Sequence, residues 1–148
     1  MPQFGRPSAD TNNPGSFTDQ AGGAVNIYLT IDEVTADDAD FIRSPTSPAS
    51  AVYVTALTSV TDPVSSTGHI IRMRTSTDLG AQESIDFTQQ LRQAYVSEAT
   101  QGTLIASQTR AGVNTTAWTT STYTLIAAEA DAITNYASLY FRFLVNRP

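Results

Sequence analysis

The stretch SIDFTQQLR, residues 84–92, shows the fold class of this chain most clearly. Ile85, Phe87 and Leu91 alternate with polar residues, and Gln89 takes the remaining position on their side. A repeat of two is typical of a β-strand with one buried face. The following QAYVSEA, residues 93–99, is expected to continue this strand past a kink or a bulge.

The same alternation predicts several further short strands. They are expected in VNIYLTI (25–31), AVYVTAL (51–57), HIIRMRT (69–75), GTLIASQTR (102–110), TAWTTSTYTL (116–125) and LYFRFLV (139–145). In the last of these, Leu139, Phe141, Phe143 and Val145 are predicted to face inward and Arg142 outward. Abundant Thr agrees with this assignment, because its branched Cβ suits a pleated surface.

Ala and Glu residues between the last two strands interrupt this pattern and favour a short helix, roughly residues 126–134. Thr124 is a candidate cap, and the early acids suit the positive end of the helix dipole. Seven or eight short strands with polar loops predict an all-β fold. We therefore expect a β-sandwich, jelly-roll-like, with one short helix before the last strand.

The chain has 148 residues, which fits a single domain. Residues 1–23 are rich in Pro, Gly, Asn and Ser, and this composition predicts an extended N-terminal arm, followed by one β-sandwich domain over 24–148. Two interpretations of the arm stay open. It is either a frayed terminus or a segment that orders against a neighbouring subunit.

Composition excludes several classes of function. Asp, Glu, Lys and Arg make up 15 % of the residues, all eight basic residues are Arg, and the net charge is −6. Such a chain lacks the basic footprint of a nucleic-acid surface and is repelled by anionic membranes. No apolar segment is long enough to span a bilayer, and no signal peptide is expected. The absence of Cys excludes thiolate catalysis and Cys-ligated zinc.

The acidic stretch IDEVTADDADFI, residues 31–42, is the strongest candidate for a site. Calcium prefers clustered carboxylates, so Asp37, Asp38 and Asp40 are candidate ligands. An EF-hand is excluded, because a loop starting at Asp32 has Asp37 where Gly is required and ends on Arg43. The favoured alternative is a turn in which Thr35 or Asp37 caps backbone amides.

Other side chains permit chemistry without requiring it. Aromatic residues can stack on sugars, and the candidates are Trp118, Tyr28, Tyr53, Tyr95 and Tyr123, although a core position is favoured for Trp118. His69 is the one histidine, and without a G-x-S-x-G elbow it is interpreted as a half-buried structural residue. No catalytic residue and no cofactor is therefore expected.

Two arginines on one predicted strand, Arg72 and Arg74, share a face. They are expected either to pair with acids such as Asp86 on a neighbouring strand or to contact another subunit. With Phe4, Arg6 and Phe17 of the N-terminal arm, they form the set of candidate interface residues.

Two segments resemble a family of small structural proteins of tailed bacteriophages. The first runs from Ile31 to Ile42, and the second, WTTSTYTLIAAEADAITNYASLYFRF, spans 118–143. GRPSADTNNPGSFT also looks like the leader of that family, except that Phe17-Thr18 stands where the family usually has Trp-Thr. The resemblance covers both ends of the chain, whereas the middle matches only in strand spacing.

This resemblance implies a non-enzymatic virion protein with a β-sandwich fold and no catalytic residues to carry over. The leading hypothesis is a capsid decoration (cement) protein, a homo-oligomer that binds the major capsid protein or other virion proteins. A neck, tail or fibre protein is the second hypothesis. A carbohydrate-binding module that uses Trp118 or the tyrosines is the third.

Overall fold

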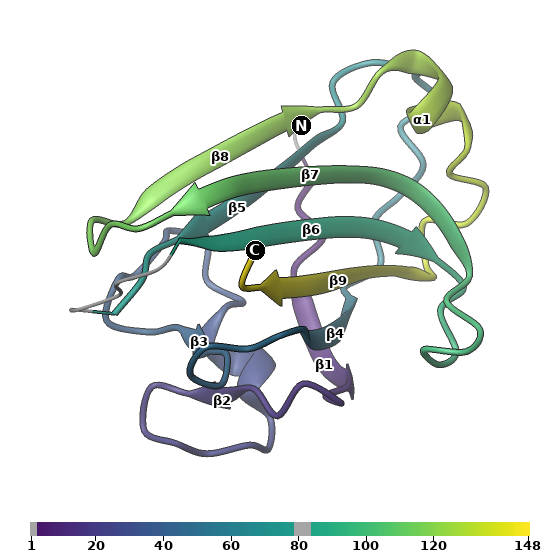
Figure 1. Cartoon of the computed structure of the whole chain (residues 1–148). Coiled ribbons are helices and arrows are strands. Elements are labelled where there is room, and N and C mark those ends of the chain that lie inside the picture. The colour runs from purple at the N-terminus through teal and green to yellow at the C-terminus, as the bar shows by residue number, and fades with distance from the viewer. Residues whose placement is uncertain (1–2, 79–83) are drawn as a thin grey trace.

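The computed structural model describes residues 3–78 and 84–148, and strands make up most of its regular structure (Figure 1). They are β1 (Pro7–Asn12), β2 (Thr18–Asp19), β3 (Ile42–Arg43), β4 (Ala51–Leu57), β5 (Ile70–Thr75), β6 (Ile85–Gln93), β7 (Thr103–Val113), β8 (Thr119–Thr124) and β9 (Leu139–Asn146). A 3-10 turn, η1 (Ile27–Thr30), lies between β2 and β3, and helix α1 (Ala127–Asp131) precedes the last strand. The prediction of an all-β fold with one short helix before the last strand is confirmed.

Five antiparallel strands form the main sheet, in the order β1-β4-β9-β6-β7. The last strand of the chain, β9, lies at its centre and pairs with both β4 and β6. The remaining strands form two separate ribbons, β5–β8 and β2–β3. The strands thus divide into five, two and two, whereas a jelly roll distributes eight strands over two sheets.

Both ribbons cover the same face of the main sheet, each through its own apolar cluster. Ile71 of β5 packs with Leu91 and Leu139 in one cluster, and Phe17 packs with Tyr53 in the other. Tyr53 has 0 % exposed surface and stacks on Phe143 with ring centroids 6.2 Å apart. Burial of these apolar side chains supplies the main driving force for holding the two layers together.

The predicted N-terminal arm is extended, but it belongs to the main sheet of its own chain. Pro7–Asn12 is the edge strand β1, which pairs with β4 through two register shifts. Gly15 lies against β4, donating from its amide to the carbonyl of Val52 at 2.9 Å. A Cβ on Gly15 would come within 2.6 Å of that carbonyl oxygen, so this close approach requires glycine.

The prediction of a strand over residues 25–31 is wrong. Residues Ile27–Thr30 form η1, which begins after Asn26 in the left-handed conformation at φ 55°. The Asp10 carboxylate accepts hydrogen bonds from the amides of Ile27 and Tyr28, both at 3.0 Å. A side chain seventeen residues away therefore stabilises the helical turn, and the alternating apolar pattern is overridden.

The predicted helix over 126–134 is shorter than expected and starts at a different cap. Helix α1 covers Ala127–Asp131, with Ile126 as its N-cap in place of Thr124. The Glu129 carboxylate accepts a hydrogen bond from the Ile126 amide at 2.9 Å and another from the Tyr123 hydroxyl at 2.8 Å. This acid therefore ties the start of the helix to the end of β8. Within residues 3–78 and 84–148, no helix has the length and apolar character needed to cross a membrane.

Candidate functional site

The acidic stretch folds as a loop, and two of its carboxylates hold that loop in place. The Asp37 carboxylate accepts a hydrogen bond from the Ala39 amide at 2.9 Å, as in an Asx turn. Both oxygens of Asp38 accept from the Arg74 guanidinium, at 2.5 and 2.6 Å. This ion pair links the loop to β5, and it lowers the pKa of Asp38. The structural interpretation of Asp37 and Asp38 agrees with this geometry.

Glu33 and Asp40 of the same loop lie next to each other, with their carboxyl groups in hydrogen-bonding reach, and a backbone amide also bonds to the Glu33 carboxylate. Each has one carboxylate oxygen that is buried and receives no hydrogen bond from the described residues. Burial raises the pKa of Glu33, and the neighbouring Asp40 acts in the same direction. Two buried acceptors that face each other are costly unless a proton or another cation joins them.

The three calcium candidates do not come together as a ligand set. Both oxygens of Asp38 contact Arg74, and Asp40 lies beside Glu33. Across the described ranges, no group of three or more His, Asp or Glu side chains could hold a metal ion. The structure therefore pairs Asp40 with an acid that the sequence pattern did not select.

This loop forms one wall of a groove of about 520 Å³, a volume in the range of ligand-binding pockets. The other walls are β5, the inner face of β6 and β9, and the N-terminal segment before β1. Rings and charged groups both line it: Phe4, Phe41, Phe87, Trp118, Phe141, Phe143, Arg6, Glu33, Asp37, Asp38, Asp40, Arg72 and Arg74. The groove therefore offers apolar walls with a few charged groups placed among them.

Trp118 lies on the wall of this groove and is half-buried, so it does not fill the core as favoured above. Its ring lies 5.5 Å from that of Phe41, measured between centroids, and the Arg43 guanidinium sits 5.6 Å from the centroid of Phe41. Tyr53 and Tyr95 are buried and are not available to stack on a sugar. Among the candidate sugar-stacking residues, Trp118 is the one that lines the groove.

The candidate interface residues have different environments. Phe4 is 56 % exposed, and the Arg6 guanidinium lies 5.5 Å from the centroid of its ring. Arg72 and Arg74 are exposed on β5, but Arg74 pairs with Asp38 and not with Asp86, because β6 does not neighbour β5 in a sheet. Phe17 is 3 % exposed and belongs to the core, so its selection as an interface residue is corrected.

A second polar cluster lies on the opposite face of the main sheet and was missed by the sequence reasoning. Arg142 of β9 was predicted to face outward, yet it is only 7 % exposed. The loop after β6 covers it, and its guanidinium forms an ion pair with Glu98 at 2.5 Å. Arg142 holds the pKa of Glu98 below its ordinary value. Sequence alternation indicates which face a residue takes but not whether a loop covers that face.

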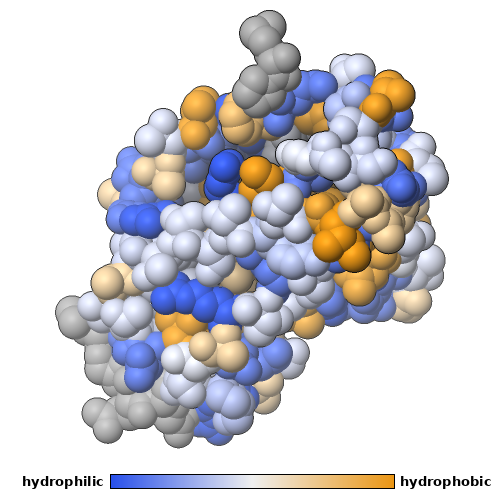
Figure 2. All heavy atoms as spheres, turned by 90° about the horizontal axis from the view of Figure 1, so that it is seen from above, coloured by the Kyte–Doolittle hydropathy of each residue, from blue (hydrophilic) through white to orange (hydrophobic). Residues whose placement is uncertain are grey.

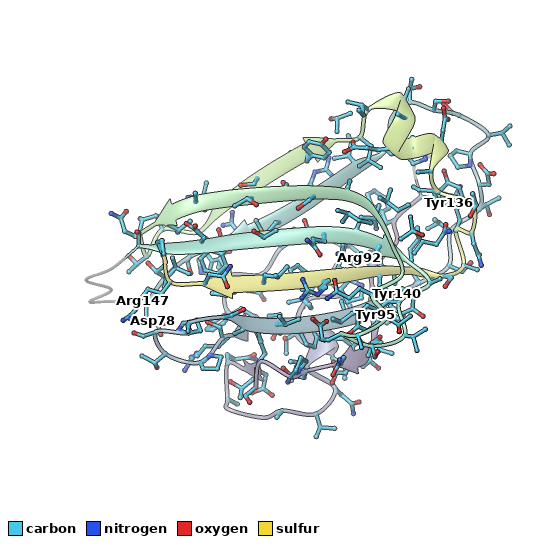
Figure 3. All side chains as sticks on the ribbon, turned by 45° about the vertical axis from the view of Figure 1, so that its right-hand side comes forward. Asp78, Arg92, Tyr95, Tyr136, Tyr140 and Arg147 are labelled. Atoms are coloured by element: carbon cyan, nitrogen blue, oxygen red, sulfur yellow. The ribbon has the colours of Figure 1, made fainter. Side chains whose placement is uncertain are left out.

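Arg92 anchors the same loop from β6. It lies opposite Tyr140 in the β6–β9 register, and Figure 3 shows Arg92, Tyr95 and Tyr140 at the same end of the sheet. Its guanidinium donates to the Gln90 side chain at 2.8 Å and to the Gln101 carbonyl at 3.2 Å. Burial lowers the pKa of Arg92, and the nearby charge of Arg142 acts in the same direction. Two buried arginines thus hold this loop on the sheet.

His69 precedes β5 and is half-buried, as predicted. Its Nε2 lies 2.8 Å from the Tyr136 hydroxyl, and their rings are 5.9 Å apart. This contact joins the start of β5 to the segment after α1. The geometry around His69 is that of a structural contact between two elements.

Comparisons of this chain with protein-family models, curated proteins and solved structures find no match.

Proposed function

We propose that this chain is a non-enzymatic structural protein of a tailed-phage virion, and that it decorates the outer surface of the head as a cement protein. The observation that carries the proposal is that side chains of the two segments that resemble phage proteins join neighbouring elements of the fold. Several of their polar side chains are occupied in holding the fold together: Asp37, Asp38, Glu129, Tyr136 and Arg142.

In the first segment, Asp37 shapes a turn and Asp38 ties the loop to β5 through Arg74. In the second segment, Glu129 fixes the start of α1, and Tyr136 contacts His69. Arg142, at the end of that segment, forms an ion pair with Glu98. These contacts join neighbouring elements, which is what a rigid surface for assembly requires.

The surface composition agrees with this role. The face shown in Figure 2 is mostly hydrophilic or neutral, with apolar residues in a few small groups. Thr-rich β8 presents uncharged polar side chains along its length. Broad polar interfaces with bridging water are common between proteins that associate without forming a shared core. The partner in this proposal is the major capsid protein, contacted by several copies of this chain in a symmetric arrangement.

The test is mass spectrometry of purified particles followed by electron cryo-microscopy of the same particles. The chain is expected among the virion proteins, with density on the head at a copy number that follows the capsid symmetry. Absence from the particles would overturn the proposal. Density on the neck, tail or fibre would replace the cement role with the second hypothesis.

The third hypothesis, a carbohydrate-binding module, remains a candidate because Trp118 and Phe41 line the groove together with carboxylates. An aromatic wall with nearby charged groups is an arrangement in which a sugar ring can stack. Binding on a glycan array that is lost in Trp118→Ala, with the β-sheet circular-dichroism spectrum unchanged, would favour this function. No binding on the array would count against it.

A further inference from the structure

The layer that covers the main sheet is divided by the groove. In the part of the chain that the structure describes, β5 pairs only with β8, and β3 pairs only with β2. Residues of both β5 and β3 line the groove, whose floor is the inner face of β6 and β9. Both ribbons therefore reach the groove, and β5 lines it along its whole length.

An unpaired strand carries backbone groups that can bind another chain. In an antiparallel pair, alternate residues point their N–H and C=O groups away from the partner strand. β5 pairs with β8 from Ile70 to Thr75, so its outward backbone groups lie on the side away from β8. An extended peptide bound along such an edge gains main-chain hydrogen bonds, and alternate side chains enter the neighbouring pockets.

The charged groups in the groove indicate what this peptide carries. Glu33 and Asp40 each have a buried oxygen without a donor from the described residues. At neutral pH, a guanidinium or an ammonium group would donate to both carboxylates and remove their repulsion. The rings of Phe41, which follows Asp40 in sequence, and of Trp118 can cover the apolar stem of such a side chain.

We propose that the groove binds an extended segment of a partner protein, which adds to the free edge of β5 and places an arginine or lysine beside Glu33 and Asp40. This inference rests on the proposed function, so the partner is a protein of the virion. Charge complementarity identifies the occupant. This chain has a net charge of −6 and no Lys, Arg74 of the groove already pairs with Asp38, and the buried oxygens of the acid pair receive no hydrogen bond from the described residues.

The experiment uses particles that lack this chain, to which purified full-length protein is added. Binding of Glu33→Gln/Asp40→Asn is compared with wild type by co-sedimentation over a range of protein concentrations. We expect the double variant to bind at least about tenfold more weakly, because a cation at the interface loses both of its charged partners. The matched control is Asp62→Asn/Asp131→Asn, which removes two exposed acids outside this groove and is expected to bind like wild type.

Hydrogen exchange of the bound protein tests the strand directly. The amides of Ile70–Arg74 are expected to exchange more slowly on the particle than in free protein. Equal binding of both double variants, or unchanged exchange in β5 on the particle, would overturn the inference while leaving the cement role intact. Failure of wild type to bind any particle would overturn both proposals. Competition by a soluble glycan would assign the groove to sugar and would also overturn the inference.

Discussion

Two glutamates on opposite faces of the main sheet have contrasting environments. Glu98 lies over the outer face and accepts hydrogen bonds from Arg142 and from the Tyr95 hydroxyl. Glu33 lies in the groove on the inner side, beside Asp40, with a buried oxygen that receives no hydrogen bond from the part of the chain that the structure describes. The pKa of Glu98 is lowered by its partners, and the pKa of Glu33 is raised by burial. A partly buried acid therefore stabilises the fold only where the tertiary structure supplies donors.

The two environments distinguish the outer face of the main sheet, where the charged groups are paired within the chain, from the groove on its inner side, where an acid pair is not. The outer cluster of Arg92, Arg142 and Glu98 is complete within this chain, since each charged group contacts other residues of the chain. The acid pair in the groove is incomplete. For this reason we assign a role in stability to the outer cluster and a role in partner binding to the acid pair.

Removing Arg142 is expected to have the largest effect on stability. Arg142→Met keeps much of the side-chain volume but leaves the Glu98 carboxylate without its charged partner. We expect a loss of about 3 kcal/mol in the free energy of unfolding, as for breaking a mostly buried ion pair. Urea unfolding followed by tryptophan fluorescence measures it. A loss no greater than that of an exposed substitution would show that the outer cluster does not hold the fold.

Glu98→Gln is expected to cost about 1 to 2 kcal/mol at pH 7, because the hydrogen bonds to Arg142 lose one of their two charges. The folded-state pKa of Glu98 is lowered from its ordinary value of 4.5. Its contribution is therefore full above that value and is lost as the pH falls through the lower, folded-state pKa. Unfolding curves of wild type and variant between pH 7 and about pH 3 should converge in acid. A difference that stayed constant with pH would contradict this account.

Glu33→Gln is expected to act in the opposite direction. The folded-state pKa of Glu33 is raised above its ordinary value of 4.5, so the protonated form is favoured in the fold. The contribution of Glu33 to the stability of wild type is therefore fully present below that value, and it is lost as the pH rises through the folded-state pKa. We expect the variant to be more stable than wild type by about 0.5 to 1 kcal/mol at pH 7 and equal to it at about pH 4. A destabilised variant at pH 7 would show that the backbone hydrogen bond to the Glu33 carboxylate outweighs its burial and the repulsion from Asp40.

Asp38→Asn is expected to have the smallest effect. The Asp38–Arg74 ion pair is exposed to solvent, and such pairs contribute little because water and salt screen them. The midpoint of urea unfolding should shift slightly in dilute buffer and not at all in about 0.5 M NaCl. A large shift that persisted in salt would mean that this pair holds the loop more strongly than an exposed ion pair does.

The strands could be predicted from sequence where burial alone determines the pattern. Ala51–Leu57 was predicted with its observed bounds. The predicted continuation of β6 over 93–99 is wrong, because β6 ends at Gln93 and a loop follows. The groove could not be predicted, because its walls come from the N-terminal segment, the acidic loop, β5 and β9 together. Asp40 was selected as a candidate ligand, but its neighbour Glu33 was not. The fold of the loop brings these two residues together, and the sequence pattern does not show that fold.

The sequence by itself determined the fold class, the approximate positions of most strands and the short helix before β9. Period-two alternation and residue propensity are local properties, so they can be read without knowing the neighbours. The tertiary structure decided the fate of residues 25–31, the burial of Arg142 and the donors available to each acid. Asp10 caps η1 from seventeen residues away, and Glu98 reaches Arg142 across forty-four. Contacts between such distant residues depend on the path of the whole chain, and no local pattern contains that path.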